Sequence, residues 1–169
     1  ADNLTVKDDF VAFAGYEWTF HRPDENEMKT FNHRIVLFTG GDSEVARRNE
    51  TAGMTEDSFN RFMDEHKNFV FPHHAYWDLP DKCRETVVEI TSGWGTYIFD
   101  APVVHNTLSA GKKIGFIGCG DSHRFMPGLS GALVGVYAKK CSKSAIIEAL
   151  NARRCFATTG NRTAVAFWV

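Results

Sequence analysis

Short apolar segments recur along the whole chain, and each one stops at a group of glycine, proline or charged residues. Such segments are too short for long helices, and they predict buried strands over residues 10–16, 33–38, 68–71, 86–90, 114–117 and 132–138. The stretches between them are either polar or spaced like helices. This alternation is typical of an α/β domain, which is the fold class that we expect.

Three segments between the apolar runs have helical features. We expect helices that begin at Thr55 or Asp57, near Val104 and after Ser142. In the first of them, the residues of the expected buried face recur at positions i, i+3, i+4 and i+7, from Phe59 to His66. The second stops at Gly111, a residue that commonly ends helices. Residues 163–169 are apolar again and predict a last strand.

Composition and charge exclude several classes of protein. The chain has 169 residues, 43% hydrophobic and 24% charged, so residues 1–169 are predicted to form a single folded domain. Nineteen basic and 21 acidic residues give a net charge of -2, which argues against nucleic acid as the main partner. The apolar runs are far shorter than a membrane span, and no leader peptide is visible. The cellular location stays open.

The cysteines do not predict a metal or redox motif. Their positions, Cys83, Cys119, Cys141 and Cys155, contain no Cys-x-x-Cys spacing, which argues against zinc-finger and thioredoxin-type sites. We expect four reduced thiols, and one or two disulfides remain the alternative. Candidate chemistry is therefore carried by imidazoles and carboxylates.

Polar side chains stand where the predicted strands give way to loops. Glu17 follows the first strand, His73 follows the third, and Asp121 and His123 follow Ile114–Ile117. The carboxyl ends of strands form the functional edge of α/β sheets. His33 begins a strand instead, but an antiparallel hairpin between strands 10–18 and 33–38 puts it beside Glu17. We therefore expect all five side chains to lie within about 8 Å of a common centre.

Imidazoles and carboxylates suit Zn, Mn or Fe in a hydrolytic site, where the metal lowers the pKa of a bound water. In an extended segment Asp121 and His123 point the same way, so both side chains can face one metal cluster. Each residue also has a purely structural interpretation. Asp121 suits an Asx turn in a polar loop, Glu17 suits a first solvated loop residue, and His33 suits a strand edge.

The remaining candidates are weaker. Strand alternation allows only one of His73 and His74 to face inward, so at most one of them is expected to be a metal ligand. Glu89 is interpreted as an outward-facing strand residue, with a supporting role behind a metal ligand as the alternative. His66 is expected to pack on its helix, and His105 and His21 have little support.

Taken in order, these motifs resemble the PHP superfamily of metal-dependent phosphoesterases, named for polymerase and histidinol phosphatase. The resemblance covers roughly residues 10 to 162 and rests on six motifs in the family's order: Gly15–Thr19 (GYEWT), Asn32–His33, Phe71–His74 (FPHH), Val88–Ile90 (VEI), Gly118–His123 (GCGDSH) and Arg153–Gly160 (RRCFATTG). It implies an α/β fold of a particular kind, a partial distorted (β/α)7 barrel of the PHP type.

The resemblance also implies a ligand set and an activity. Glu17 would bridge two metals, His33 and His73 would complete the shell of one, and Asp121 and His123 would serve the others. One to three divalent ions (Zn, Mn or Fe) would activate a hydroxide for attack on a small phosphorylated or other anionic substrate. Asp121, His123 and Arg124 are the candidate catalytic residues, and Arg124 or Arg162 would neutralise phosphoryl oxygens.

One family motif is absent: no His-x-His precedes residue 17, or stands anywhere in the chain. We therefore expect a domain truncated at its N-terminus that binds at most one or two metals alone and has little activity. The missing segment, or another chain, would be its partner. The alternative functions are a non-catalytic metal- or ligand-binding module and a metal-dependent hydrolase of a C–N or C–O bond.

Overall fold

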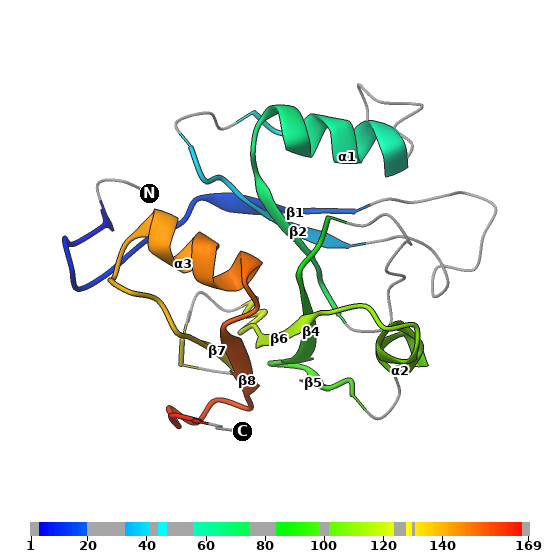
Figure 1. Ribbon diagram of the computed structural model, residues 1–169. Helices are drawn as coiled ribbons and strands as arrows, with labels where there is room; N and C mark the ends of the chain where they lie inside the picture. The colour runs from blue at the N-terminus through cyan, green and yellow to red at the C-terminus, as the bar shows by residue number, and fades with distance from the viewer. Residues whose placement is uncertain are drawn as a thin grey trace.

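The computed structural model describes residues 4–19, 33–40, 44–46, 56–74, 84–98, 102–123, 128–129 and 131–166. Within these ranges the elements follow in the order β1 (Gly15–Trp18), β2 (Arg34–Leu37), α1 (Glu56–Glu65), β3 (Phe69–Pro72), β4 (Val87–Ser92), β5 (Gly95–Thr96), α2 (Pro102–Ser109), β6 (Gly115–Gly118), β7 (Leu133–Val136), α3 (Lys143–Asn151) and β8 (Cys155–Thr158). Figure 1 shows the helices α1, α2 and α3 on the outside of the short strands.

The strands form three small sheets in the described part of the chain, with the orders β1-β2-β3, β5-β4-β6 and β7-β8. Only β4 and β6 pair in parallel, and every other pair is antiparallel. The expected α/β fold, a partial (β/α)7 barrel, is therefore wrong. The described residues form mainly small, mostly antiparallel sheets with few helices, and none of these sheets closes on itself. The physical reason is that α1 and α3 connect antiparallel neighbours, whereas a barrel requires each helix to bring the next strand back in parallel.

The first and last predicted strands differ most from the structure. Residues 11–14 lie outside β1, and Phe10, which is 55% exposed, forms an isolated bridge with Val6 instead of entering the sheet. At the other end, residues 163–166 are exposed and belong to no strand, while residues 167–169 lie outside the described ranges. The sequence did not predict β5 or β8, and β8 follows α3 and pairs with β7. An apolar run alone thus does not determine which residues pair in a β-sheet.

Helix α1 covers the β1-β2-β3 sheet. Phe59 and Met63, both fully buried, pack with Trp18 of β1 and Val36 of β2. The rings of Trp18 and Phe59 are stacked, with centroids 4.0 Å apart. The helical spacing predicted this buried face of α1. Through it the helix packs against one side of the first sheet.

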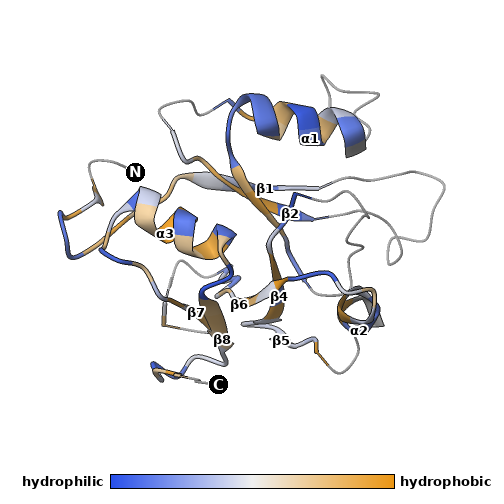
Figure 2. Cartoon of the chain, in the orientation of Figure 1, coloured by the Kyte–Doolittle hydropathy of each residue, from blue (hydrophilic) through white to orange (hydrophobic). Residues whose placement is uncertain are grey.

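Helix α3 lies over the strands of all three sheets. Its Leu150 shares a core with Phe71 of β3, Val87 of β4 and Ile117 of β6. Ser142 is the N-cap that the sequence predicted, because its hydroxyl accepts a hydrogen bond from the amide of Ala145. In Figure 2 parts of the ribbon of α3 and of β4 have the colour of hydrophobic residues.

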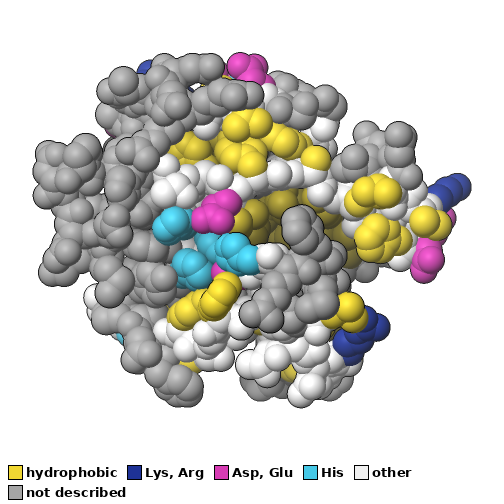
Figure 3. Space-filling view, turned by 180° about the vertical axis from the view of Figure 1, so that it is seen from behind, with side chains coloured by type: hydrophobic (Ala, Val, Ile, Leu, Met, Phe, Trp, Pro, Cys, Tyr) yellow, Lys and Arg dark blue, Asp and Glu magenta, His cyan; other side chains and the backbone are white. Residues whose placement is uncertain are grey.

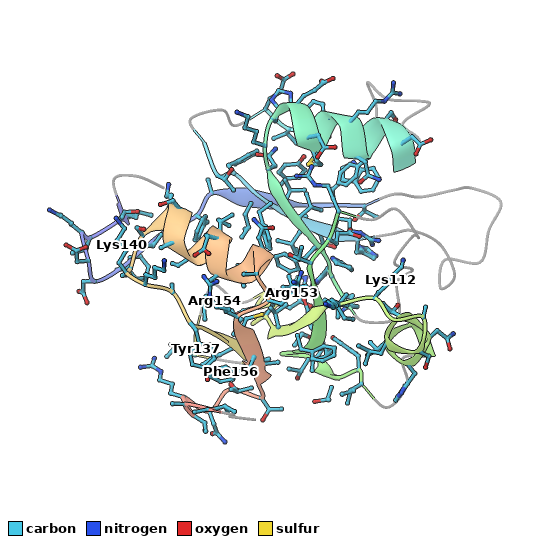
Figure 4. The ribbon with its side chains drawn as sticks, in the orientation of Figure 1. Lys112, Tyr137, Lys140, Arg153, Arg154 and Phe156 are labelled. Carbon is cyan, nitrogen blue, oxygen red and sulfur yellow. The ribbon has the colours of Figure 1, made fainter. Side chains whose placement is uncertain are left out.

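The β7-β8 sheet is attached to the end of α3. Arg154, just before β8, donates to Glu148 of the helix and to the carbonyl oxygen of Tyr137. The ring of Tyr137 packs against Phe156 of β8, with centroids 5.5 Å apart (Figure 4). These contacts join the chain's last described strand to the rest of the core.

Cys119, Cys141 and Cys155 are free thiols, as expected, and Cys83 lies outside the described residues. None of the helices in the described ranges has the length and apolarity that crossing a bilayer requires.

A buried ion pair joins β2 to the residues just before β4. The Nε of Arg34, a fully buried residue of β2, donates to Glu85 Oε1 at 2.5 Å, and Glu85 lies just before β4. Burial raises the pKa of the Glu85 carboxyl, and the charge and hydrogen bond of Arg34 oppose that effect. The pair connects the first sheet with the segment before β4, and removing either partner takes away the opposite charge in direct contact with the other buried group.

We expect Glu85→Ala to lower the free energy of unfolding by about 3–5 kcal/mol, because a buried guanidinium loses its carboxylate. Urea unfolding followed by circular dichroism measures the change. Glu148→Ala is the control, since it removes the carboxylate of the exposed pair with Arg154 and should leave stability almost unchanged. Equal losses in the two variants would contradict a special role for the buried pair.

Candidate metal centre

The first hairpin brings Glu17 and His33 together. Strands β1 and β2 pair antiparallel, as predicted, with Glu17 opposite Ile35. His33 Nδ1 lies 2.7 Å from Glu17 Oε1 and 3.0 Å from the hydroxyl of Thr19. The hydrogen bond with His33 lowers the pKa of Glu17 below its usual value, although partial burial opposes it. The carboxylate and the imidazole are therefore fixed at one end of the sheet.

His73 continues the same ladder on the neighbouring strand. The register that pairs Arg34 with Pro72 brings His73 opposite His33, and the His73 amide donates to the His33 carbonyl oxygen at 3.0 Å. His73 is only 4% exposed. Backbone pairing thus places two histidines from distant parts of the sequence next to each other.

Glu89 of β4 holds the His73 ring from the second sheet. Glu89 is fully buried, and its Oε2 lies 2.7 Å from His73 Nδ1. Burial would lower the pKa of His73, but the hydrogen bond to Glu89 and the surrounding carboxylates raise it above its usual value. Burial also raises the pKa of Glu89, against the effect of the imidazole. This contact leaves Nε2 of His73 as the nitrogen that points away from Glu89.

His74 faces the same cluster, so the expectation that it turns away from His73 is wrong. Its φ of 70° lies in the left-handed region, because the chain has left β3 at Pro72 and strand alternation no longer applies. The rings of His73 and His74 are 3.9 Å apart at 31°. Burial and the neighbouring imidazoles lower the pKa of His74 to about 4. The ring is therefore neutral at pH 7 and carries a lone pair.

Asp121 enters from the carboxyl end of β6, which runs parallel to β4. Its Oδ2 lies 3.5 Å from His73 Nε2, and its Oδ1 lies 3.6 Å from His123 Nδ1. Asp121 has a φ of 44°, which a short polar residue tolerates in a turn. The side chain of His123 is 69% exposed, so it borders the cluster on the solvent side.

The structure brings the five predicted ligands into one continuous set of contacts. Glu17 and His33 form its first pair, and Asp121 and His123 form its other end. The connection runs through His74, whose ring lies 6.2 Å from that of His33 and stacks on His73. Figure 3 shows histidine and acidic side chains gathered near the centre of one face, with hydrophobic side chains beside them.

Three of these residues have the spacing that a single metal ion requires. One ligand atom each from His73, His74 and Asp121 lies within 4.8 Å of the other two. Two imidazoles and a carboxylate are typical ligands of Zn, Mn and Fe. The nearby Cys119 thiol is not a comparable ligand, because burial and the Glu89 charge raise its pKa well above the usual value.

The predicted phosphate-binding arginines are not part of this cluster in the described residues. Arg124 lies outside the described ranges, and Arg162 lies in an exposed segment after β8. A cavity of about 290 Å³ lies at the opposite end of β3, lined by polar residues that include Asp64, Asn68 and Arg84. Asp64 and Arg84 pair there at 2.8 Å. It is a separate feature, away from the histidines.

Sequence reasoning gave Glu89 and His74 the wrong orientations. Glu89 was expected to face outward, but β4 is buried on both faces, so alternation of burial does not reveal which of its side chains is exposed. β3 ends at Pro72, two residues before His74, and this proline is the sequence signal that strand alternation does not extend to His74. The alternative for Glu89, a supporting role behind His73, agrees with its position.

Comparisons with known proteins give limited information. A family model described as "Protein of unknown function (DUF3604)" matches residues 124–169, which begin after the candidate metal ligands. No curated protein and no solved structure matches the chain.

The contact between Glu89 and His73 can be tested without a metal. We expect the Nδ1 proton of His73 to be visible and slow to exchange in ¹H–¹⁵N spectra, because a buried carboxylate accepts it at 2.7 Å. Glu89→Ala should abolish that signal, and Glu89→Gln should keep a weaker one through its amide oxygen. Glu148→Gln, on the surface of α3, is the control. An unchanged His73 signal in Glu89→Ala would contradict the contact.

Proposed function

We propose that this chain binds a divalent transition metal through His73, His74 and Asp121 and acts as a metal-dependent hydrolase of phosphoesters. The observation that carries the proposal is the convergence of their three ligand atoms within 4.8 Å. His73 is also oriented by a buried carboxylate, an arrangement common behind metal-bound histidines.

The residues around this group have distinct tasks in the proposed site. Glu89 accepts the Nδ1 proton of His73, which directs Nε2 toward Asp121. His74 contributes a neutral ring. Glu17 and His33 lie beside the cluster and would offer further ligand atoms to a metal, and His123 lies on its solvent side. When bound, the metal would lower the pKa of a water so that hydroxide forms near neutral pH.

The substrate class comes from the resemblance to the PHP superfamily, whose members act on phosphoesters. The motifs that carry it include Glu17, His33, His73, Asp121 and His123, and these are the side chains in mutual contact around the cluster. A partial site that binds metal without catalysis, and a hydrolase of C–N or C–O bonds, are the outcomes against which the proposal is tested.

Metal binding is the first test. Titration of the chain with Zn²⁺ or Mn²⁺ by calorimetry should show binding that falls at least about tenfold in His73→Ala, His74→Ala and Asp121→Asn, because each variant loses one ligand. His105→Ala is the control, since His105 is exposed on α2. Unchanged affinity in all three ligand variants would contradict the assigned site.

Hydrolysis is the second test. The metal-loaded chain should release nitrophenol from p-nitrophenyl phosphate, and chelation with EDTA should abolish the reaction. His73→Ala and Asp121→Asn should lose most of the activity, whereas His105→Ala should retain it. Tight metal binding without turnover would favour the non-catalytic module. Turnover of amide or carboxylic esters alone would favour the C–N or C–O hydrolase.

A further inference from the structure

Trp94 is an exposed aromatic residue that is nevertheless fixed in place. It lies in the turn between β4 and β5, and it is 68% exposed. Its indole Nε1 donates to the carbonyl oxygen of Asp121 at 3.1 Å, and its backbone amide donates to the Ser92 hydroxyl at 3.0 Å. An indole held at both its ring and its backbone presents a large apolar surface at little further entropic cost.

The turn that carries Trp94 is pressed against the loop that carries Asp121. The Gly93 amide donates to the Gly120 carbonyl oxygen at 3.2 Å. A Cβ added to Gly93 would lie only 2.4 Å from that oxygen, so no larger residue fits without moving the backbone. The Ser92 hydroxyl is in turn hydrogen-bonded to the Tyr97 hydroxyl. The position of Trp94 relative to Asp121 is therefore set by backbone contact.

This turn also borders the candidate metal centre on two sides. The Trp94 ring lies 5.5 Å from the His123 ring in an edge-to-face arrangement. Tyr97, on the other side of β5, lies 5.1 Å from the ring of His74, also edge to face. The hairpin thus adds aromatic surface next to His74 and next to the pair Asp121 and His123.

We propose that Trp94 is a stacking subsite for a flat aromatic ring attached to the phosphoester, such as an aryl group or a nucleobase. The proposal rests on the proposed function, because it places the phosphoryl group at His73, His74 and Asp121. The indole is next to that position and mostly open to solvent, whereas Trp18, which has a structural role in the core, is 4% exposed. Aromatic rings stack on exposed indoles with a preference that alkyl groups do not share.

The test compares aryl and alkyl substrates on the metal-loaded chain. Trp94→Ala should raise the KM for phenyl phosphate about three- to tenfold, as expected for the loss of one stacked ring, and leave that for glycerol 2-phosphate within about twofold. Trp94→Phe should retain most of the preference for phenyl phosphate. Leu108→Ala, which shortens an exposed apolar side chain on α2, should change neither value.

Equal losses with both substrates in Trp94→Ala would overturn the proposal, because Trp94 would then only position the Asp121 loop. Calorimetry with phenylphosphonate and methylphosphonate separates this proposal from the proposed function. Tighter binding of phenylphosphonate that depends on Trp94, in a chain that hydrolyses no phosphoester, would retain the subsite and reject the hydrolase. Phenylphosphonate binding that is unaffected by Trp94→Ala would reject the subsite, whatever the activity.

Discussion

The hydrogen bond between Glu89 and His73 is the contact on which the candidate site depends. His73 follows the last strand of the first sheet, and Glu89 lies in the central strand of the second, so the bond joins two sheets that share no strand. A fully buried carboxylate needs such a partner, because its charge would otherwise be strongly disfavoured. Asp121, in the loop that follows β6, then meets the other nitrogen of the same ring.

A second buried polar contact also joins the first sheet to the segment that contains β4. Arg34 of β2 is buried against Glu85, which precedes the same strand that carries Glu89. The carboxylates of Glu85 and Glu89 therefore belong to one segment of the chain, and each contacts a residue from the first sheet or directly after it. Apolar contacts can slide relative to each other, whereas paired buried charges specify one alignment. Both pairs therefore hold the segment that contains β4 against residues of the first sheet and against His73 beside it.

The sequence predicted the residues of the cluster better than the fold that holds them. Strand-end reasoning placed Asp121 and His73 correctly at one edge, and the antiparallel hairpin brought Glu17 to His33, because these relations depend only on local chain direction. The barrel was wrong because the direction of each new strand depends on long-range pairing. The pairing of β2 with β3 across α1, for example, cannot be deduced from helical spacing.

Two antiparallel strand pairs supply residues to the cluster around His73 and His74, and they contribute different chemistry. The β1-β2 hairpin supplies a carboxylate and an imidazole, Glu17 and His33, in direct contact. The β4-β5 hairpin supplies Glu89, which is hydrogen-bonded to His73 Nδ1, and Trp94 in the exposed turn. In the proposed enzyme, one continuous element would therefore both orient a metal ligand and recognise the substrate. A shift of β4 would disturb the two functions together, because Glu89 holds His73, which contacts Asp121, and Trp94 in the following turn donates to the backbone of the same Asp121.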